Sequence, residues 1–246
     1  MNFAYTFQYN SPYLKGKDNS KKPRPWDLNQ EIILQSKKTD TLLDIGCGSC
    51  QKLIPFVPYL KKIIGIDISE SLLNVGRQLN DQKKIANIEL ILADSHKLPF
   101  KNHFFDIVTC MLSTWKISEI IRILKPNGKV IIEHVGGEDK LTFKKFFGKD
   151  SNGWRGQFLN YIKNEHLDNL HQLLKKYFKN VTIKNGYWQT YYTKKGLLDL
   201  LYFTPTIRNF NFKKDYRALE KAIKHHQTSQ GILLTQNRIL IHANNI

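Results

Sequence analysis

Short apolar segments alternate with segments of helical spacing between residues 41 and 136, and this alternation constrains the fold more than any other feature. The apolar segments are Leu42–Ile45, Ile63–Asp67, Ile88–Ala93, Phe105–Met111 and Lys129–Val135. Each is nearly continuous, as in strands buried on both faces of a parallel sheet. Helical spacing of Ile and Leu covers Ser69–Asn80 and Lys116–Leu124. The pattern predicts a doubly wound α/β sheet, which binds ligands at the carboxyl ends of its strands.

The second half of the chain has a different pattern. It predicts helices at Glu165–Phe178, Lys195–Phe203 and Lys214–His225, and strands at Val181–Thr193 and Leu233–Ala243. Leu141–Gly156 is expected to be irregular or partly helical. Near the N-terminus, Asp27 is a good cap for a helix over Leu28–Gln35.

Two glycines follow the first apolar segment, in Asp44-Ile45-Gly46-Cys47-Gly48. Glycines at this spacing let a ligand approach the backbone closely. The dinucleotide fingerprint needs a third glycine where Gln51 stands, and the Gly-Lys-Ser/Thr of a P-loop is absent. An acid at Asp44 would repel a pyrophosphate but attract an ammonium group. The turn therefore predicts a nucleoside ligand that carries an amino group and no phosphate.

The next two apolar segments also end near an aspartate. Asp67 lies 19 residues after Gly48, a position from which a carboxylate can accept both ribose hydroxyls. Asp94 follows the third segment, where a carboxylate can accept the amino group of adenine. A single aspartate at the end of a strand is often only a helix cap. Three in corresponding positions favour a shared nucleoside site.

These motifs together resemble the class I S-adenosylmethionine-dependent methyltransferases. The matching segments are Asp44–Gly48, Gly65–Ser69, Ala93–Phe100, Phe104–Val108 and Leu124–Gly128. The resemblance implies a seven-stranded, mostly parallel Rossmann-like sheet whose last strand is antiparallel. The chain departs from the family where Cys50 replaces a usual third glycine. Pro55 and Pro58 also interrupt the following helix, which should be short or kinked.

The resemblance also implies roles for individual residues and an organisation into parts. Cofactor contacts are expected from Asp44, Gly46, Cys47 and Gly48 at the methionyl end, Asp67 and Ile68 at the ribose, Asp94 and Ser95 at adenine, and Met111 along the pocket. For Met111 a plain core position is the alternative. Residues 38–246 would form the methyltransferase domain, with 193–230 inserted as a helical lid and 1–37 helping to cover the site.

Glu133 and His134 end the fifth apolar segment and are the candidates for a catalytic general base. Because side chains alternate along a strand, only one of them can face the site. The acceptor is expected to be a small molecule, held by aromatic residues of the lid region, with Trp26 closing the other side. An RNA acceptor and a cofactor-binding protein without transfer activity remain alternatives.

The charge and the cysteines bear on partners and location. The formal net charge of +17 would attract polyanions such as RNA, but a solvated surface or a lysine-favouring codon bias explains it equally well. Cys47-Gly48-Ser49-Cys50 has redox spacing, yet no second ligand pair suggests a metal. Cys110 lies in an apolar run and is expected to be structural rather than a nucleophile. No run of about 18 apolar residues and no signal peptide are found, so a cytoplasmic protein without membrane span or metal is expected.

Overall fold

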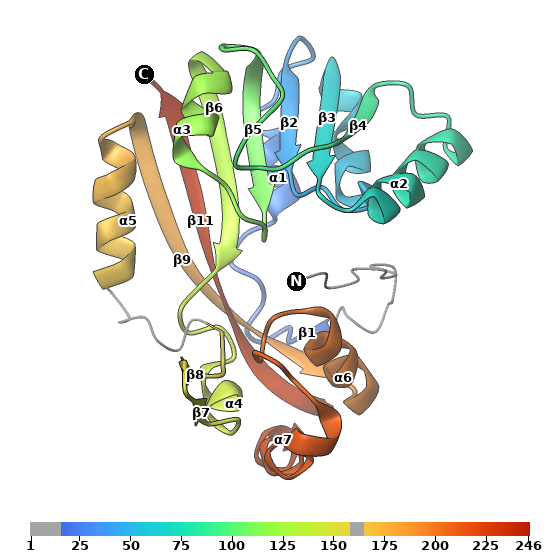
Figure 1. Ribbon diagram of the computed structural model, residues 1–246, viewed down its shortest axis with the longest axis vertical. Coiled ribbons are helices and arrows are strands. Elements are labelled where there is room, and N and C mark those ends of the chain that lie inside the picture. Colours follow the sequence, from blue (N-terminus) through green and yellow to red (C-terminus); the bar gives the residue numbers. More distant parts are fainter. Residues whose placement is uncertain (1–15, 158–164) are drawn as a thin grey trace.

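The parallel half of the sheet forms as the alternation predicts. The computed structural model describes residues 16–157 and 165–246, and Figure 1 shows its arrangement. The parallel strands are β2 (Thr41–Ile45), β3 (Lys62–Asp67), β4 (Ile88–Leu92), β5 (Phe105–Met111) and β6 (Leu124–Val135). They lie in the order β4-β3-β2-β5-β6, each parallel to its neighbour. The doubly wound α/β prediction is confirmed.

Two long antiparallel strands complete the sheet beside β6. They are β9 (Phe178–Tyr192) and β11 (Gly231–Asn245), and β11 lies between β6 and β9, antiparallel to both. The prediction of an antiparallel last strand is confirmed. The predicted count of seven strands is wrong, because the sheet has nine within the described residues. The additional strands are β1 (Lys17–Asp18) and β10 (Gln227–Thr228), which pair with the free edges of β9 and β11.

The two faces of the sheet carry separate hydrophobic cores. One face holds Leu43, Val108 and Ile132 and is packed by α3 (Ile117–Ile123) and α5 (Glu165–Lys175). The other holds Leu42, Met111 and Leu240 and is covered by α1 (Leu28–Ile33), α2 (Glu70–Gln82) and the 3-10 helix η1 (Gln51–Tyr59). The predicted Asp27 cap of α1 is confirmed. The two prolines leave η1 without a regular α-helical turn, as expected.

A smaller lobe lies below the carboxyl ends of the parallel strands in Figure 1. It contains α4 (Leu141–Lys145), β7 (Lys149–Asp150), β8 (Gly153–Trp154), α6 (Lys194–Phe203) and α7 (Phe212–His226). Residues 187–192 of β9 and 231–237 of β11 extend past β6 into it. Its core includes Phe143, Leu197, Leu219 and Ile232. We call this unit the lower lobe; it recruits residues 141–157 as well as the predicted 193–230 insertion.

Candidate functional site

The glycine turn after β2 leaves room for a ligand at one of its two glycines. Gly46 (φ +77°) and Gly48 (φ +55°) both have left-handed backbone conformations. A Cβ on Gly46 would lie 2.2 Å from the Ser113 hydroxyl, so Gly46 is required for packing. A Cβ on Gly48 would meet nothing within 4 Å. Gly48 therefore borders open space where a ligand can approach the backbone.

Cys50 takes the conformation that a glycine would take. Its φ is 55°, in the left-handed region, although it carries a buried side chain. The thiol Sγ lies 3.7 Å from the Gly76 carbonyl oxygen and 3.5 Å from Asn80 Oδ1, both on α2. A Cβ on Gly76 would come within 3.2 Å of that sulfur. The Cys50 side chain is thus accommodated by a glycine on the facing helix.

Asp44 is buried at the centre of the sheet, beside the turn. Its Oδ1 accepts a 2.7 Å hydrogen bond from the Thr109 hydroxyl of β5. Burial raises the pKa of Asp44 to about 7, against the lowering effect of that hydrogen bond. Asp44 can therefore gain a full negative charge when a cation binds near it.

Asp67 connects the first two motifs. Its Oδ2 accepts a 2.8 Å hydrogen bond from the Gly48 N–H, and its Oδ1 accepts one of 2.9 Å from the Ser69 N–H. Ile68, next to it, is 74% exposed. The carboxylate is half-buried and still has lone pairs for further donors. The arrangement places an acceptor group and an uncovered apolar side chain beside the open space at Gly48.

Asp94 and Ser95 follow β4 in a more open setting. Asp94 is exposed and accepts a 2.8 Å hydrogen bond from the His96 N–H, and its Oδ1 lies 3.0 Å from His96 Nδ1. The hydrogen bond from the His96 N–H keeps the pKa of Asp94 below its usual value. Ser95 is buried, with its hydroxyl 3.4 Å from that of Thr114. His96 is exposed and lies within ion-pair distance of Asp94.

The register of the sheet brings several predicted residues onto one face. Asp44 pairs with Thr109, and Met111 pairs with Glu133. Paired residues point to the same side, as do residues two apart in a strand. Asp44, Thr109, Met111 and Glu133 therefore share a face. Met111 is buried in the core of that face, which keeps both its pocket-lining and core interpretations open.

Glu133 is the member of the predicted pair that faces this side. It is 4% exposed, and its Oε2 accepts a 2.8 Å hydrogen bond from the indole Nε1 of Trp26. His134 points to the opposite face, and its Nδ1 lies 3.0 Å from the Val135 carbonyl oxygen. Trp26 was expected to close the site, but its bond to Glu133 was not foreseen. Thr109 was also missed, although a hydroxyl in an apolar strand is a detectable signal.

The three cysteines are buried and unpaired by disulfides. Burial raises the pKa of Cys50 to about 11 and that of Cys110 to about 12, and it raises the pKa of Cys47 as well. These thiols stay protonated at neutral pH, which disfavours redox chemistry at Cys47 and Cys50. Across residues 16–157 and 169–246, whose side chains the structure describes, no group of three or more His, Cys, Asp or Glu side chains is arranged to hold a metal ion.

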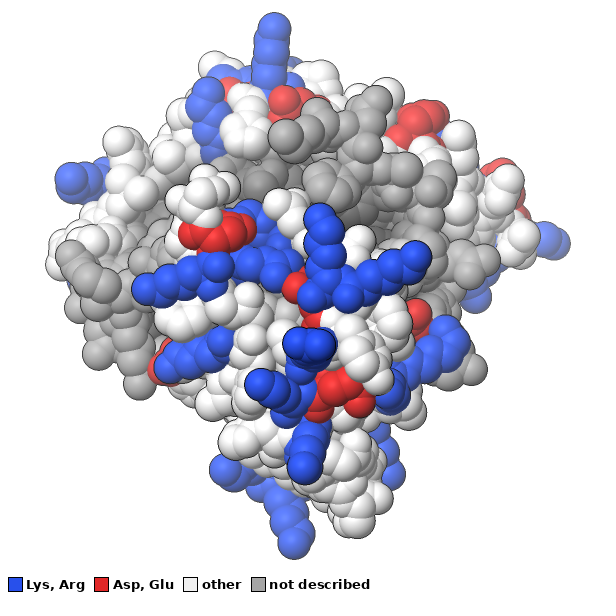
Figure 2. All heavy atoms as spheres, turned by 60° about the horizontal axis from the view of Figure 1, so that its bottom comes forward, with Lys and Arg blue, Asp and Glu red and all other residues white. Residues whose placement is uncertain are grey.

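The positive charge is concentrated on exposed side chains and is interrupted by acids. Figure 2 shows Lys and Arg over much of the face that includes the lower lobe, with Asp and Glu among them. Exposed cations of α7 are Lys213, Lys214, Arg217, Lys221 and Lys224. Several others are paired, such as Lys194 with Glu220 at 2.8 Å. In the described part of the chain, no helix has the length and apolar character needed to cross a membrane.

Comparison with known proteins identifies a matching family and several named relatives. A family described as a methyltransferase domain matches residues 36–195. The uncharacterized methyltransferase YcgJ of Bacillus subtilis is 29% identical over 144 residues, 53% of this chain and 57% of that protein. A demethylmenaquinone methyltransferase of Bacillus cereus is 29% identical over 132 residues, 50% of this chain and 56% of that protein. The matches span little more than half the length of these relatives.

Solved structures share the fold at low sequence identity. The crystal structure of Bacillus subtilis YcgJ superposes with a TM-score of 0.60 at 16% identity, over 89% of this chain and 97% of that one. Phosphoethanolamine N-methyltransferase 2 of Haemonchus contortus, solved with phosphomonomethylethanolamine and S-adenosylhomocysteine, gives 0.56 at 23% identity, over 89% and 52%. The family match spans all five parallel strands, and the chain belongs to the methyltransferase domain family, whose class I, Rossmann-like fold it adopts.

Proposed function

We propose that this chain binds S-adenosylmethionine and transfers its methyl group to a small-molecule acceptor. The observation that carries the proposal is the set of acids Asp44, Asp67 and Asp94 around a glycine turn without a phosphate-binding signature. S-adenosylmethionine supplies an electrophilic methyl group and carries an ammonium, a ribose and an adenine. The curated relatives, named as methyltransferases, support this activity.

The proposed cofactor contacts follow the order of the strands. Asp44, Gly46, Cys47 and Gly48 would hold the methionyl end, Asp67 and Ile68 the ribose, Asp94 and Ser95 the adenine, and Met111 would line the pocket. The open space at Gly48 leaves room for a nucleoside. The half-buried carboxylate of Asp67 lies beside that space and can accept hydrogen bonds from ribose hydroxyls. The Haemonchus contortus enzyme, which shares the fold and was solved with S-adenosylhomocysteine, further supports the proposed cofactor.

Glu133 is the proposed general base for the acceptor. It shares a face of the sheet with Asp44 and Met111, and Trp26 fixes its orientation through a 2.8 Å hydrogen bond. A base here would take a proton from the acceptor as the new bond to carbon forms, where the acceptor's own pKa requires it. His134 faces the other side and is the weaker candidate. The rest of the chain would position the acceptor against the methyl group of the cofactor and exclude water from the site.

The division into parts extends this proposal. Residues 193–230, with α6 and α7, would form the lid over the acceptor, and residues 1–37 would help to cover the site. Trp26 supports the second assignment through its contact with Glu133. Much of segment 1–37 lies outside the described residues. A cytoplasmic location is proposed from the free cysteines.

Two alternatives are less well supported. An RNA acceptor rests on the net charge alone, and Figure 2 shows Asp and Glu among the exposed cations of the face that includes the lower lobe. A protein that binds the cofactor without transferring its methyl group would share the same strands and acids. Neither the charge nor the cofactor contacts separate these alternatives, so a transfer assay is needed.

The test has two stages that separate binding from transfer. Calorimetry with S-adenosylhomocysteine should give a saturable one-to-one complex; no binding at millimolar concentration would refute the cofactor proposal. Incubation with methyl-labelled S-adenosylmethionine and fractionated extract should then place label in the small-molecule fraction. Label in RNA would favour the rival acceptor, and binding without label in any fraction would favour the protein that only binds the cofactor.

A further inference from the structure

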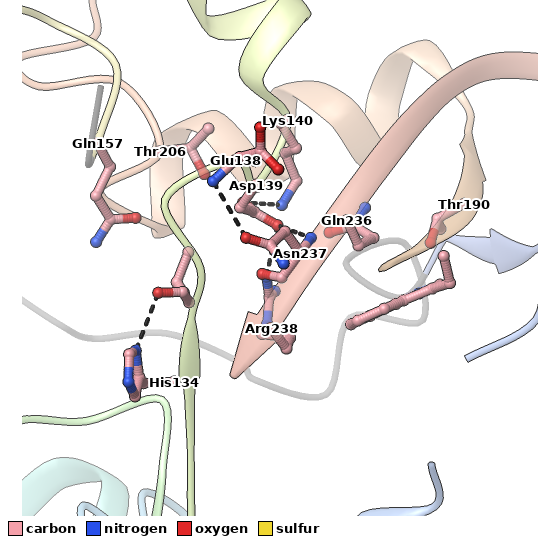
Figure 3. A network of polar contacts seen from close by, with 12 residues as sticks. His134, Glu138, Asp139, Lys140, Gln157, Thr190, Thr206, Gln236, Asn237 and Arg238 are labelled. Atoms are coloured by element: carbon pink, nitrogen blue, oxygen red, sulfur yellow. Dashed lines mark hydrogen bonds and ion pairs between the residues drawn. The ribbon is translucent and has the colours of Figure 1, made fainter. Parts of the chain in front are cut away.

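The lower lobe contains a group of buried charges that the cofactor proposal does not use. The carboxylate of Asp139, on the loop after β6, is surrounded by three cations. Its Oδ2 lies 2.8 Å from Lys140 Nζ and 3.6 Å from Lys144 Nζ, and its Oδ1 lies 2.5 Å from Arg238 Nη1. Figure 3 shows Asp139 and Lys140 on the loop and Arg238 on β11. We call these four residues the cation cluster.

The cation cluster carries more positive than negative charge in a buried place. Asp139, Lys140 and Lys144 are each at most 3% exposed. In the described part of the chain, Asp139 is the one carboxylate within ion-pair distance of these cations. Among the residues whose side chains the structure does not describe, 1–15 and 158–168, the acids are Glu165 and Asp168. With all three cations protonated, the cluster has a net charge of +2, which burial makes costly.

The carboxylate of Asp139 is already fully engaged. Besides its three cations, Oδ1 accepts a 3.1 Å hydrogen bond from the Asn237 N–H. Burial raises the pKa of Asp139, but the surrounding cations overcome this effect and hold it below its usual range. Burial also lowers the pKa of Lys140, and it lowers that of Lys144 to about 8. The cluster therefore lacks an anion rather than a cation.

Arg238 is the member through which such an anion could be reached. It is the most exposed of the four, at 12%, and its Nη1 bonds Asp139 and the Asn237 carbonyl oxygen. In the part of the chain that the structure describes, Nε and Nη2 have no recorded acceptor. The guanidinium also lies over the ring of Trp188, 5.5 Å from its centroid, which holds its plane. The Nε and Nη2 groups of the planar Arg238 guanidinium can therefore donate hydrogen bonds to a ligand.

The sheet register relates Arg238 to the proposed methyl-transfer site. Arg238 pairs with Val135, and Leu240 pairs with Glu133, so Arg238 lies on the same face as Glu133, Met111 and Asp44. Glu133 and Arg238 are diagonal neighbours on adjacent antiparallel strands. Such neighbours are about 7–8 Å apart. A small molecule with its nucleophilic atom at Glu133 could place an acidic group at Arg238.

We propose that the methyl acceptor is a small anionic molecule whose carboxylate or phosphate binds Arg238, with the buried lysines of the cation cluster supplying the attracting field. The inference rests on the proposed methyltransferase function, because it assigns the substrate class of that site. The cluster neutralises the acidic group at one end of the acceptor, while Glu133 accepts a proton from the nucleophilic atom at the other end. Asp139 keeps the three cations in place when the acceptor is absent.

The test measures binding of inorganic phosphate and of benzoate to the protein saturated with S-adenosylhomocysteine. At least one should bind, and Arg238→Gln should weaken its binding about tenfold or more, by loss of a charged, two-donor contact. Affinity for S-adenosylhomocysteine should stay within about twofold. The control is Arg208→Gln, which removes a lower-lobe arginine paired with Asp150 and should change neither affinity. The two probes separate a phosphate site from a carboxylate site.

The outcomes are separable from the failure of the proposed function. If neither anion binds, or if Arg238→Gln binds as well as the unchanged protein, the anion site is wrong even where S-adenosylhomocysteine binds. If anions bind through Arg238 but S-adenosylhomocysteine does not, the site stands and the acceptor role is overturned. Should Arg238→Gln fail to fold, Arg238→Lys keeps the charge beside Asp139 but loses the fork. It should weaken binding by about threefold or more, and equal binding would overturn the proposal.

Discussion

The carboxyl ends of β2–β4 and the lower lobe below β6 present opposite charges. The first region carries Asp44, Asp67 and Asp94, spread along an edge with open space at Gly48. The second carries the cation cluster, in which three buried or nearly buried cations surround the carboxylate of Asp139. A positively charged cofactor and a negatively charged acceptor would be drawn to different ends of one sheet face. The comparison predicts that changes in one region alter one ligand and spare the other.

The largest expected effect is on the cofactor side, at Asp67. Asp67→Ala should weaken S-adenosylhomocysteine binding roughly 100- to 1000-fold, because the two charge-assisted hydrogen bonds proposed between this carboxylate and the ribose would be lost. The same change releases the Gly48 and Ser69 N–H groups, which disturbs the turn itself. Calorimetry measures the affinity, and thermal unfolding reports whether the fold survives.

The control for Asp67 is Asp81→Ala, which removes an exposed acid on α2 and should leave cofactor affinity unchanged. Benzoate or phosphate binding should be insensitive to both changes. If Asp67→Ala binds S-adenosylhomocysteine normally, the ribose assignment is wrong. If it weakens both ligands equally, the two regions are not independent.

The second effect is a pH dependence centred on Asp44. Its pKa is raised to about 7, so below that pH the free protein holds Asp44 neutral, while a bound ammonium favours the carboxylate. Cofactor binding then releases a proton, and affinity should rise with pH, by up to about tenfold per unit between pH 5 and 7. Calorimetry across this range in buffers of different ionisation enthalpy measures both affinity and proton release.

Asp44→Asn is the matched variant for this pH dependence, since it retains a group that can accept from Thr109 and removes the titration. It should bind more weakly at pH 7 and show a flat profile. A slope that persists in Asp44→Asn would assign the proton to another group.

Much of the cofactor side is predictable from sequence, and little of the acceptor side is. Asp44, Asp67 and Asp94 stand at the ends of strands that their own apolar runs define, so local pattern is enough to find them. The Thr109–Asp44, Trp26–Glu133 and Arg238–Asp139 contacts join residues 65, 107 and 99 positions apart. They depend on which strands become neighbours and in which register. No local pattern carries that information.

The strand count fails for a related reason. β1 and β10 are two residues long, too short to show any periodicity, and they form only because β9 and β11 offer free edges. The hairpin of β7 and β8 is not predicted for the same reason, since each of its strands is two residues long. By contrast, the apolar, β-branched and aromatic residues of β9 and β11 predict both strands, although β9 begins three residues earlier than predicted and β11 extends beyond both predicted ends. Long elements with their own pattern are predictable, and short ones induced by tertiary pairing are not.

The third effect tests the acceptor side through Trp26. Trp26→Phe keeps an aromatic ring but removes the donor to Glu133, which leaves a buried carboxylate oxygen unsatisfied, and it removes the indole atoms that face Gly186. The free energy of unfolding should fall by about 1–3 kcal/mol. Chemical denaturation measures it. Cofactor affinity should change less than stability, because the Trp26 indole bonds Glu133 and, among the described residues, no hydrogen bond joins it to Asp44, Asp67 or the glycine turn.

Trp188→Phe is a matched control for Trp26, as it also removes an indole donor, but one that bonds the more exposed Asp18. Its cost should be smaller, since water can replace the lost bond. Equal losses in the free energy of unfolding would mean that the Trp26–Glu133 hydrogen bond stabilises the fold no more than the exposed Trp188–Asp18 bond.

The smallest effect is expected where the chain departs from its family, at Cys50. Cys50→Gly removes the strain of a side chain in the left-handed region, about 1–2 kcal/mol, and loses a buried thiol of similar worth. Stability should therefore stay within about 1 kcal/mol, and S-adenosylhomocysteine affinity within about twofold. Gly76→Ala, the control on the facing helix, would bring a Cβ within 2.6 Å of Leu90 Cδ1 and should cost about 1–3 kcal/mol. A large loss of cofactor affinity in Cys50→Gly would mean that the thiol itself shapes the turn, and that this cofactor side differs from its relatives in more than packing.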